Sequence, residues 1–357
     1  MEFGIQFFPD VGPEEKSAQA YWNESLYLSE VADQIGYGHV RTVEHYFHRY
    51  GGYSTNPIVF LAAAAQRTKK MRLITGAVLP IFNHPLKLAG EIGMLDAISN
   101  GRAEIGFARA FMPHEFQVFG RSMDESRARF AEGIEQIRRL LEEENVTSHG
   151  QFYSFDNVTS LPRPTQKPRP PFWIATTASA ESQIMAAKGG HSIMTVPVGG
   201  PQQARKVIDT YREAWVAEGQ PGRGKVMIGL HMYCAPTQEE AERRAKPRVE
   251  NYFVSLLDAH LKMKGPPSKD YPATNDKMID AMRRATFEDR IKAGVVFVGS
   301  PANLREQIES YDHLCGGLDK ISLQVNFHDM PVDEAEASIR LFAEEVMPYF
   351  NRATEPA

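Results

Sequence analysis

Short apolar runs alternate with longer segments of helical period along nearly the whole chain. Between the runs, apolar residues recur every three or four positions, as over 85–98, where Leu88, Ile92 and Leu95 share one stripe. Such alternation is typical of βαβ units in a parallel sheet. Eight runs predict strands, at 4–8, 40–43, 71–78, 103–107, 172–176, 192–196, 226–233 and 320–325. Eight strand–helix units predict an α/β fold, namely a closed (β/α)8 barrel of the TIM type.

An open doubly wound sheet is the alternative arrangement of the same elements. A dinucleotide-binding sheet of that kind carries a glycine-rich turn after its first strand. Here the first strand runs into FFPDVGPEE, which contains no GxGxxG pattern. The 357 residues would suit two or three average domains, but α/β barrels reach this size as one unit. We therefore expect a single barrel domain over residues 1–357.

Two regions interrupt the alternation. Residues 143–171 end in PRPTQKPRPP and predict a surface excursion that leads into the strand at 172–176. Residues 234–319 contain helical patterns over 238–262 and 278–290, separated by GPPSKDYPATND. A span of this length predicts an insertion between strands 7 and 8 of the barrel, above one rim.

The charge and cysteine content argue against several classes of function. The net charge is −5 and the sequence pI is about 6.2, which argues against nucleic-acid and membrane-surface partners. No run of about 18 apolar residues occurs, so no membrane span is expected. The two cysteines make neither a disulfide framework nor a zinc-binding pair. We expect a cytoplasmic protein in a reducing environment.

The strand at 40–43 runs directly into Glu44 and His45, two side chains that are costly to bury. Active sites of (β/α)8 barrels lie at the carboxyl ends of the strands, so both side chains can point into the barrel mouth. The alternative is a hydrogen-bonded pair that fixes a loop.

A metal site is a further alternative for this stretch, because His45 and His48 are three residues apart. Metal sites need three or four convergent ligands, and the other strand ends add only Asp10 and His231. We therefore expect no metal.

An anion site is predicted where the strands at 103–107 and 172–176 end. The first runs into Arg109, and the second into TTASAES, where Ser179 is placed as an N-cap with Ser182 three residues on. Helix N-terminal N–H groups and hydroxyls beside a guanidinium bind phosphate well. Each feature alone is explained by capping or by a rim salt bridge; their position on adjacent strands favours phosphate.

Apolar and aromatic side chains are numerous around the same strand ends. A wide apolar pocket beside a phosphate site suits a planar heterocyclic cofactor with a phosphate tail. Some of these side chains belong to the core. The predicted pocket residues are Phe8, Phe47, Phe111, Met112, His231 and Tyr233.

Several motifs, taken in order, resemble the bacterial luciferase family of flavin-dependent monooxygenases. They are VEHYF, ITGAVLP, SNGRAEIGFARAFMPHEFQVFG, MDESRARF and VGSPANLREQI. The resemblance covers residues 1–350 and implies a TIM-type barrel. It implies that reduced FMN and O2 form a C4a-peroxyflavin that oxygenates a small hydrophobic organic substrate.

The resemblance assigns roles at the flavin ring. His45 falls on a histidine that acts as a general acid or base, and Glu44 lies near the reactive edge of the ring. Gly76 and Ala77 fall where the family often has a cis peptide bond beside the flavin. Ala108 stands where luciferases often have a reactive cysteine, which weakens an expectation of light emission.

The resemblance also assigns the phosphate site. Arg109 falls on a phosphate-binding arginine and Arg127 on a second one, while Ser179 and Ser182 fall on the helix start that receives the phosphate. Ala178 takes the place of an acidic residue common there.

The resemblance also implies a mobile lid, because residues 262–292 match one in position.

Partners follow from the same resemblance. A separate NAD(P)H:flavin reductase is expected, because the chain has no evident second nucleotide-binding domain. A homodimer is expected through the helices after strands two and three. The alternatives are hydride transfer with the deazaflavin F420 and flavin binding without turnover.

Overall fold

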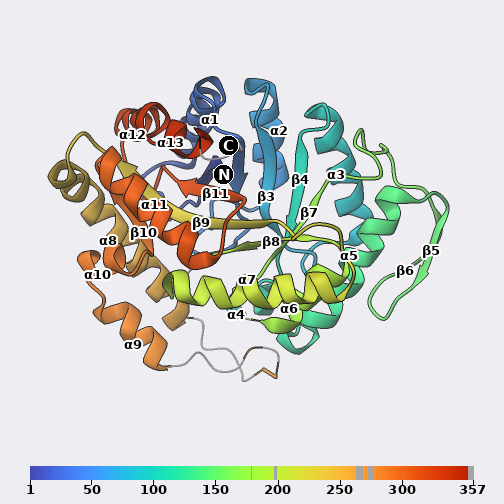
Figure 1. The fold of residues 1–357 in the computed structure, drawn as a ribbon. Coiled ribbons are helices and arrows are strands. Elements are labelled where there is room, and N and C mark those ends of the chain that lie inside the picture. Colours follow the sequence, from blue (N-terminus) through green and yellow to red (C-terminus); the bar gives the residue numbers. More distant parts are fainter. Residues whose placement is uncertain (178, 197–198, 263–267, 270, 272–275, 353–357) are drawn as a thin grey trace.

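Eight parallel strands close into a barrel, as predicted (Figure 1). This computed structural model describes residues 1–177, 179–196, 199–262, 268–269, 271 and 276–352. Around the ring the order is β1-β2-β3-β4-β7-β8-β9-β11, closed by the pairing of β11 with β1. The strands of the ring are β1 (Glu2–Phe7), β2 (His39–Thr42), β3 (Arg72–Val78), β4 (Ala103–Phe107), β7 (Phe172–Ala175), β8 (Ser192–Thr195), β9 (Val226–Cys234) and β11 (Lys320–Gln324).

Helices surround the barrel and connect successive strands (Figure 1). Local sequence signals set their ends, as where Asn56 caps α2 and Pro57 occupies its first turn. The helices are α1 (Ala18–Ile35), α2 (Pro57–Arg67), α3 (Pro85–Ile98), α4 (Pro113–Val118), α5 (Ser126–Glu142), α6 (Ala180–Lys188), α7 (Gly200–Ala217), α8 (Gln238–Lys262), α9 (Asp276–Arg284), α10 (Phe287–Lys292), α11 (Pro301–Cys315), α12 (Val332–Glu345) and α13 (Met347–Arg352), with a 3-10 turn η1 (Met123–Glu125).

The two interruptions hold more structure than the sequence predicted. The surface excursion contains an antiparallel hairpin of β5 (Val146–His149) and β6 (Ser154–Val158). The insertion contains β10 (Val296–Gly299), which pairs with the carboxyl half of β9. The single helix expected over 278–290 is wrong: it is divided into α9 and α10, because Thr286 makes a capping box that starts a new helix.

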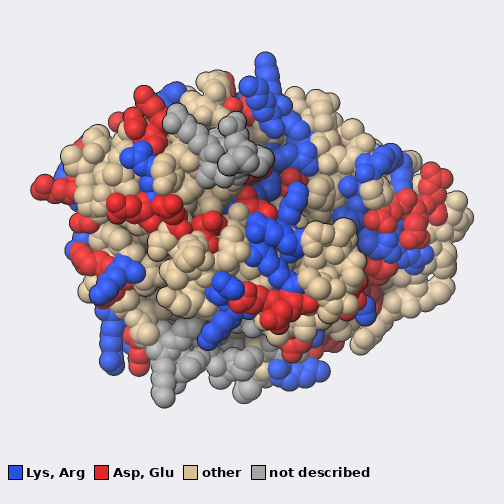
Figure 2. Space-filling view, in the orientation of Figure 1, with Lys and Arg blue, Asp and Glu red and all other residues tan. Residues whose placement is uncertain are grey.

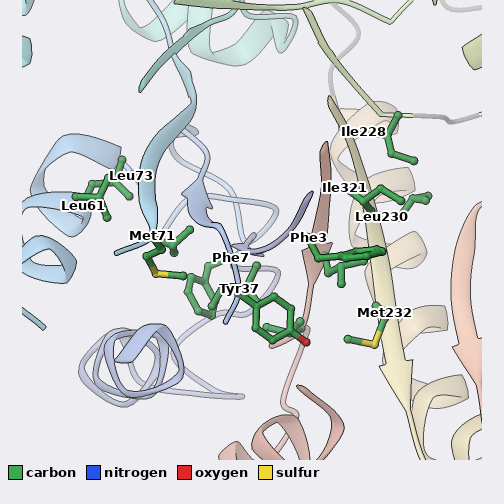
Figure 3. Packing of buried hydrophobic residues seen from close by; sticks show 14 of the residues in the cluster. Phe3, Phe7, Tyr37, Leu61, Met71, Leu73, Ile228, Leu230, Met232 and Ile321 are labelled. Carbon is green, nitrogen blue, oxygen red and sulfur yellow. The ribbon is translucent and has the colours of Figure 1, made fainter. Parts of the chain in front are cut away.

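The main apolar core lies between the barrel and its helices. Figure 3 shows part of it, with Phe3, Ile228, Leu230 and Ile321 grouped together; all four are buried. Leu230 belongs to the fully buried strand β9. A continuous apolar run of this kind is typical of a strand in a parallel barrel.

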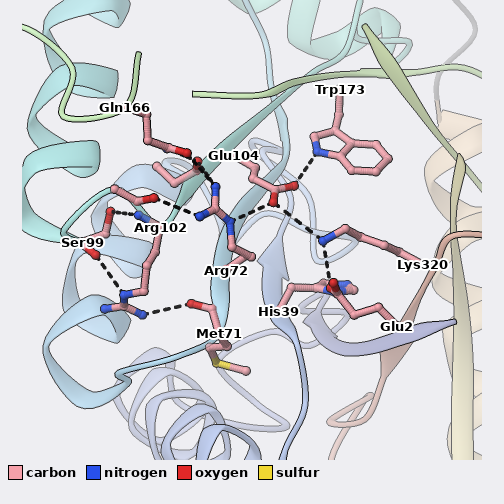
Figure 4. A network of polar contacts seen from close by, with 12 residues as sticks. Glu2, His39, Met71, Arg72, Ser99, Arg102, Glu104, Gln166, Trp173 and Lys320 are labelled. Carbon is pink, nitrogen blue, oxygen red and sulfur yellow. Dashed lines mark hydrogen bonds and ion pairs between the residues drawn. The ribbon is translucent and has the colours of Figure 1, made fainter. Parts of the chain in front are cut away.

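Polar side chains fill the amino end of the barrel interior (Figure 4). Lys320 Nζ lies 2.8 Å from Glu2 Oε1 and 3.7 Å from Glu104 Oε1. Glu104 also accepts hydrogen bonds from Arg72 Nε at 2.9 Å and from Trp173 Nε1 at 2.7 Å. These buried charges compensate one another, as stability requires. The network occupies the amino end, whereas active sites of (β/α)8 barrels lie at the carboxyl ends of the strands.

Basic and acidic side chains are interspersed on the face shown in Figure 2. Within the described part of the chain, no helix is long and apolar enough to cross a membrane.

Candidate functional site

Glu44 lies at the carboxyl end of β2 and is almost fully buried. Its carboxylate accepts hydrogen bonds from Leu79 N at 3.0 Å, Asn83 Nδ2 at 3.0 Å and Tyr46 Oη at 2.5 Å. Burial raises the pKa of Glu44 to about 7, although these hydrogen bonds act in the opposite direction. Glu44 therefore fixes the segments after β2 and β3, and it can exchange a proton near neutral pH.

His45 does not pair with Glu44; its partner is Glu115 of α4. The His45 Nδ1 to Glu115 Oε1 distance is 3.2 Å, and the Glu115 carboxylate is fully buried. Tyr46 N also donates to Glu115 Oε1, at 2.9 Å. A carboxylate that accepts from Nδ1 orients the imidazole and leaves Nε2 to exchange protons.

Sequence reasoning missed Glu115. The available signal was an acidic residue two positions after Pro113, in a short helix that follows a barrel strand. Nothing in the sequence connects that position with His45, since 70 residues separate the two. The pairing of β3 with β2 and β4 brings the two strand ends to one rim.

Arg127, Ser179 and Ser182 converge at the start of α6. Ser179 caps the helix, and Ser182 Oγ donates to Ser179 Oγ at 3.2 Å. Glu181 places its carboxylate among them: its Oε2 accepts from Ser179 Oγ at 3.0 Å and lies 3.4 Å from Arg127 Nη1. Its own backbone N–H, the Ser179 hydroxyl and Arg127 lower the pKa of Glu181. This group, the α6 anion cradle, thus already holds a carboxylate.

Arg109 follows β4, which pairs with β7 directly before the α6 anion cradle. Among the described residues, Arg109 makes no hydrogen bond with Ser179 or Ser182. Its guanidinium lies 4.5 Å from the centre of the Tyr271 ring, and its Nη1 is buried without a hydrogen-bond partner among those residues. An unsatisfied guanidinium nitrogen and a hydroxyl-rich helix start on adjacent strands fit a phosphate. Ala178 lies outside the described residues.

The Gly76–Ala77 peptide bond is cis, at the position implied by the family resemblance. Gly76 has no room for a side chain, since the aliphatic part of Arg41 lies against it.

An aromatic cluster joins His45 to the opposite side of the barrel. Around His45 lie the rings of Phe8 and Phe111, with centroids 5.6 and 5.7 Å away. Phe8 contacts Tyr252 at 5.6 Å, which in turn lies 4.2 Å from His231. Burial lowers the pKa of His231 to about 3, and its Nε2 has no hydrogen-bond partner in the described residues. Phe8, Phe111 and His231 thus belong to one connected aromatic cluster.

The other three predicted pocket residues lie elsewhere. Phe47 is 58% exposed, and its ring lies 5.5 Å from that of Phe119 in a tilted arrangement, outside the cluster. Met112 is fully buried in the main core, where it precedes α4. Tyr233 bonds to Arg244 of α8, since the insertion covers the end of β9.

Part of the 262–292 segment crosses to the strand ends. Tyr271 Oη donates to Ala110 O at 2.6 Å. Asp124 Oδ1 accepts from Ser268 Oγ at 2.6 Å and from Lys269 N at 2.9 Å. Residues 263–267, 270 and 272–275 lie outside the described residues. The segment therefore contacts the same rim that holds Arg109.

His48 lies 3.2 Å from Asp258 through Nε2. In the described ranges, no group of three or more His, Cys, Asp or Glu is arranged to hold a metal ion.

The fold is that of a (β/α)8 barrel, and polar side chains gather at the carboxyl ends of its strands, where such barrels carry their active sites. The sequence model of the luciferase-like monooxygenase family matches residues 1–316, and the chain belongs to that family. It is therefore an oxidoreductase of the flavin-dependent monooxygenase type.

Relatives with known names agree with this class. The chain is 29% identical to the oxygenase component of a flavin-dependent trigonelline monooxygenase from Acinetobacter baylyi, over 99% of this chain and 96% of that one. The crystal structure of monooxygenase RslO1 from Streptomyces bottropensis is 43% identical, with a TM-score of 0.87 over 98% and 100% of the two chains.

Two more distant structures share the fold alone. The oxygenating constituent of 3,6-diketocamphane monooxygenase from Pseudomonas putida, solved with FMN, has a TM-score of 0.83 at 21% identity and covers 98% of each chain. The coenzyme F420-dependent tetrahydromethanopterin reductase of Methanopyrus kandleri has a TM-score of 0.73 at 20% identity, over 98% and 99% of the chains.

Proposed function

We propose that this chain is the oxygenase component of a two-component monooxygenase. It takes reduced FMN from a separate NAD(P)H:flavin reductase and uses O2 to oxygenate a hydrophobic organic substrate. The observation that carries this proposal is the α6 anion cradle, in which Arg127 and Ser179 hold a carboxylate at the carboxyl end of the barrel. Because a phosphate makes the same contacts with higher charge, it can displace that exposed carboxylate.

The residues divide into four roles: phosphate binding, support of the flavin ring, proton transfer and substrate contact. Arg109, Arg127, Ser179 and Ser182 bind the phosphate, with the backbone at position 178 beside them. Gly76 and Ala77 support the flavin ring. When bound, reduced FMN supplies the electrons that activate O2. Every further contribution comes from the chain: it binds, orients and excludes water.

Proton transfer is assigned to His45. Glu115 accepts from Nδ1 and holds the imidazole toward the mouth, so Nε2 can give or take a proton beside the flavin. Glu44, bonded to Leu79, lies against the segment that follows Gly76 and Ala77. Because its pKa is about 7, Glu44 can act as a second proton donor or acceptor near the ring.

The substrate contacts are assigned to Phe8, Phe111 and His231. These side chains are linked by ring contacts through His45 and Tyr252, which makes a largely apolar cluster at the strand ends. Burial keeps His231 neutral, so this surface favours an uncharged organic substrate over an ionic one.

A homodimer is proposed through α2 and α3, which pack side by side. Val59 of α2 is 67% exposed and Met94 of α3 is 53% exposed, while Ile98 is also exposed. Exposed apolar side chains on neighbouring helices favour burial against a second copy. Sedimentation velocity at micromolar concentration tests this, and a stable monomer contradicts it.

The test of the phosphate site uses two substitutions that should change FMN affinity in opposite directions. Arg127→Ala is expected to weaken FMN binding about ten-fold, because one charge-assisted contact is lost. Glu181→Gln is expected to strengthen it about three-fold, because a weaker competitor then occupies the cradle. Riboflavin, which lacks the phosphate, should respond to neither. Equilibrium dialysis of both flavins checks this; equal changes for riboflavin would place the phosphate elsewhere.

Hydride transfer with F420 is the second candidate, because an F420-dependent reductase shares the fold. Parallel titrations with reduced FMN and with F420 separate the two. Flavin binding without turnover is distinguished by release of all consumed oxygen as peroxide with every substrate.

A further inference from the structure

Arg41 of β2 crosses the interior of the barrel. Its Nη1 lies 3.6 Å from Met194 Sδ of β8 and 3.9 Å from Met227 Sδ of β9. Its Nη2 donates to Gln6 Oε1 of β1. Since β2 and the pair β8–β9 lie on opposite sides of the ring, the guanidinium lies near the barrel axis.

This guanidinium is a buried cation without a carboxylate. Arg41 is 4% exposed, and the described residues provide it with no ion pair. Its Nε lacks any hydrogen-bond partner among them. Burial lowers the pKa of Arg41 to about 10, so the side chain remains protonated at neutral pH.

At the amino end of the same barrel, by contrast, the buried cation has carboxylate partners. There Lys320 lies within 4 Å of two carboxylates, those of Glu2 and Glu104. A buried charge without such compensation costs several kcal/mol in general. Arg41 has only an amide oxygen and two thioether sulfurs, which are weak acceptors. An anion placed above it would compensate the charge.

Arg41 lies against Gly76, one of the two residues proposed to support the flavin ring. Its aliphatic part lies against Gly76, and its Nη2 lies 2.7 Å from where a Cβ on Gly229 would stand. Side chains alternate along a strand, so His231 is the next inward position after Gly229, at the mouth. The guanidinium therefore lies inside the barrel beside Gly229, one inward position below His231 on β9.

We propose that Arg41 is a positioning residue that stabilises the negative charge reduced FMN acquires at its N1–C2 carbonyl edge, and thereby makes the site selective for the reduced cofactor. This rests on the proposed function above. Reduced flavin loses its N1 proton near neutral pH, and a fixed positive charge nearby favours the anion. Oxidised FMN has no such charge on its ring, so it gains much less from Arg41.

The test compares the affinities of one protein for two oxidation states. Arg41→Met removes the charge at similar length, and Arg41→Lys keeps it. Oxidised FMN is titrated in air and reduced FMN anaerobically. We expect Arg41→Met to lose at least about ten-fold in affinity for reduced FMN and less than about two-fold for oxidised FMN. Arg41→Lys should retain most of the preference.

A control variant removes a paired charge at the opposite end of the barrel. Arg72→Met should leave the ratio of the two affinities unchanged. If Arg41→Met weakens both forms equally, or neither, Arg41 has only a packing role and the proposal is overturned. If the wild-type protein binds neither form, the proposed FMN function fails first, and the two failures are thus distinguished.

A second measurement needs no variant. The absorbance of reduced FMN bound to the wild-type protein is followed against pH. The anionic spectrum should persist to a pH clearly below that at which free reduced FMN takes up its proton. A bound flavin that titrates like free flavin would rule out the proposal, even if Arg41→Met does not fold.

Discussion

At the scale of single residues, the site depends on which partner each side chain finds. Glu44 and His45 are neighbours in sequence, yet one bonds to Leu79 and Asn83 and the other to Glu115. The motif VEHYF predicted that both would lie at the barrel mouth. Glu115 could not be found this way, because a contact across 70 residues leaves no local pattern.

Glu115→Gln tests the proton-transfer assignment at this scale. The amide cannot stabilise the imidazolium form of His45, so we expect turnover to fall by about 10- to 100-fold with FMN affinity nearly unchanged. The pH dependence of turnover should shift as well. Single-turnover oxidation of substrate by the protein loaded with reduced FMN measures this.

Glu125→Gln is a matched control, since Glu125, at the end of η1, forms an ion pair with Arg129 of α5. If Glu115→Gln has normal turnover and an unshifted pH profile, the orientation of His45 by Glu115 plays no part in the mechanism.

At the scale of elements, the strands and most helices follow from local patterns. The bounds of α3 and α8 coincide with the predicted ones, because helical periodicity of apolar residues marks both segments. The exceptions are the β5–β6 hairpin and β10. These segments are short, and they form strands because a neighbouring strand pairs with them. The contact of Tyr271 with Ala110 is of the same kind.

Asp124→Ala tests whether the 262–292 segment excludes water. Asp124 accepts from Ser268 and Lys269 without touching the proposed flavin contacts. Loss of these hydrogen bonds loosens the contact of the segment with the rim, so we expect about a two- to five-fold rise in peroxide released per reduced FMN oxidised. Asp280→Ala, which breaks a surface pair with Arg283, is the control. Equal peroxide release by both variants would contradict the role of the segment.

At the scale of the whole molecule, buried histidines connect stability to pH. Burial, Arg169 and Arg138 lower the pKa of His191 to about 4, against 6.5 for the unfolded chain. Between these values the unfolded state binds more protons, so His191 contributes stability that is lost as pH falls from about 6.5 to about 4. His39 and His231 have lowered pKa values for the same reason and the same sign.

Urea unfolding between pH 7 and pH 4 checks this linkage. Each such histidine adds a slope of up to about 1.4 kcal/mol per pH unit. His191→Gln lies outside the proposed site and should reduce the slope by up to that amount, without affecting FMN binding at pH 7. An unchanged slope would show that His191 is protonated in the folded protein.

The sequence by itself determined the barrel, the order of its strands and the rim that carries polar residues, because these depend on periodicity and on the ends of successive elements. The tertiary structure alone decided that His45 meets Glu115, that Arg127 meets Glu181 in the anion cradle and that Arg41 crosses the barrel interior with no carboxylate beside it among the described residues. Strand pairing brings those residues together from distant parts of the chain, and burial then sets their charges. No local pattern carries either kind of information.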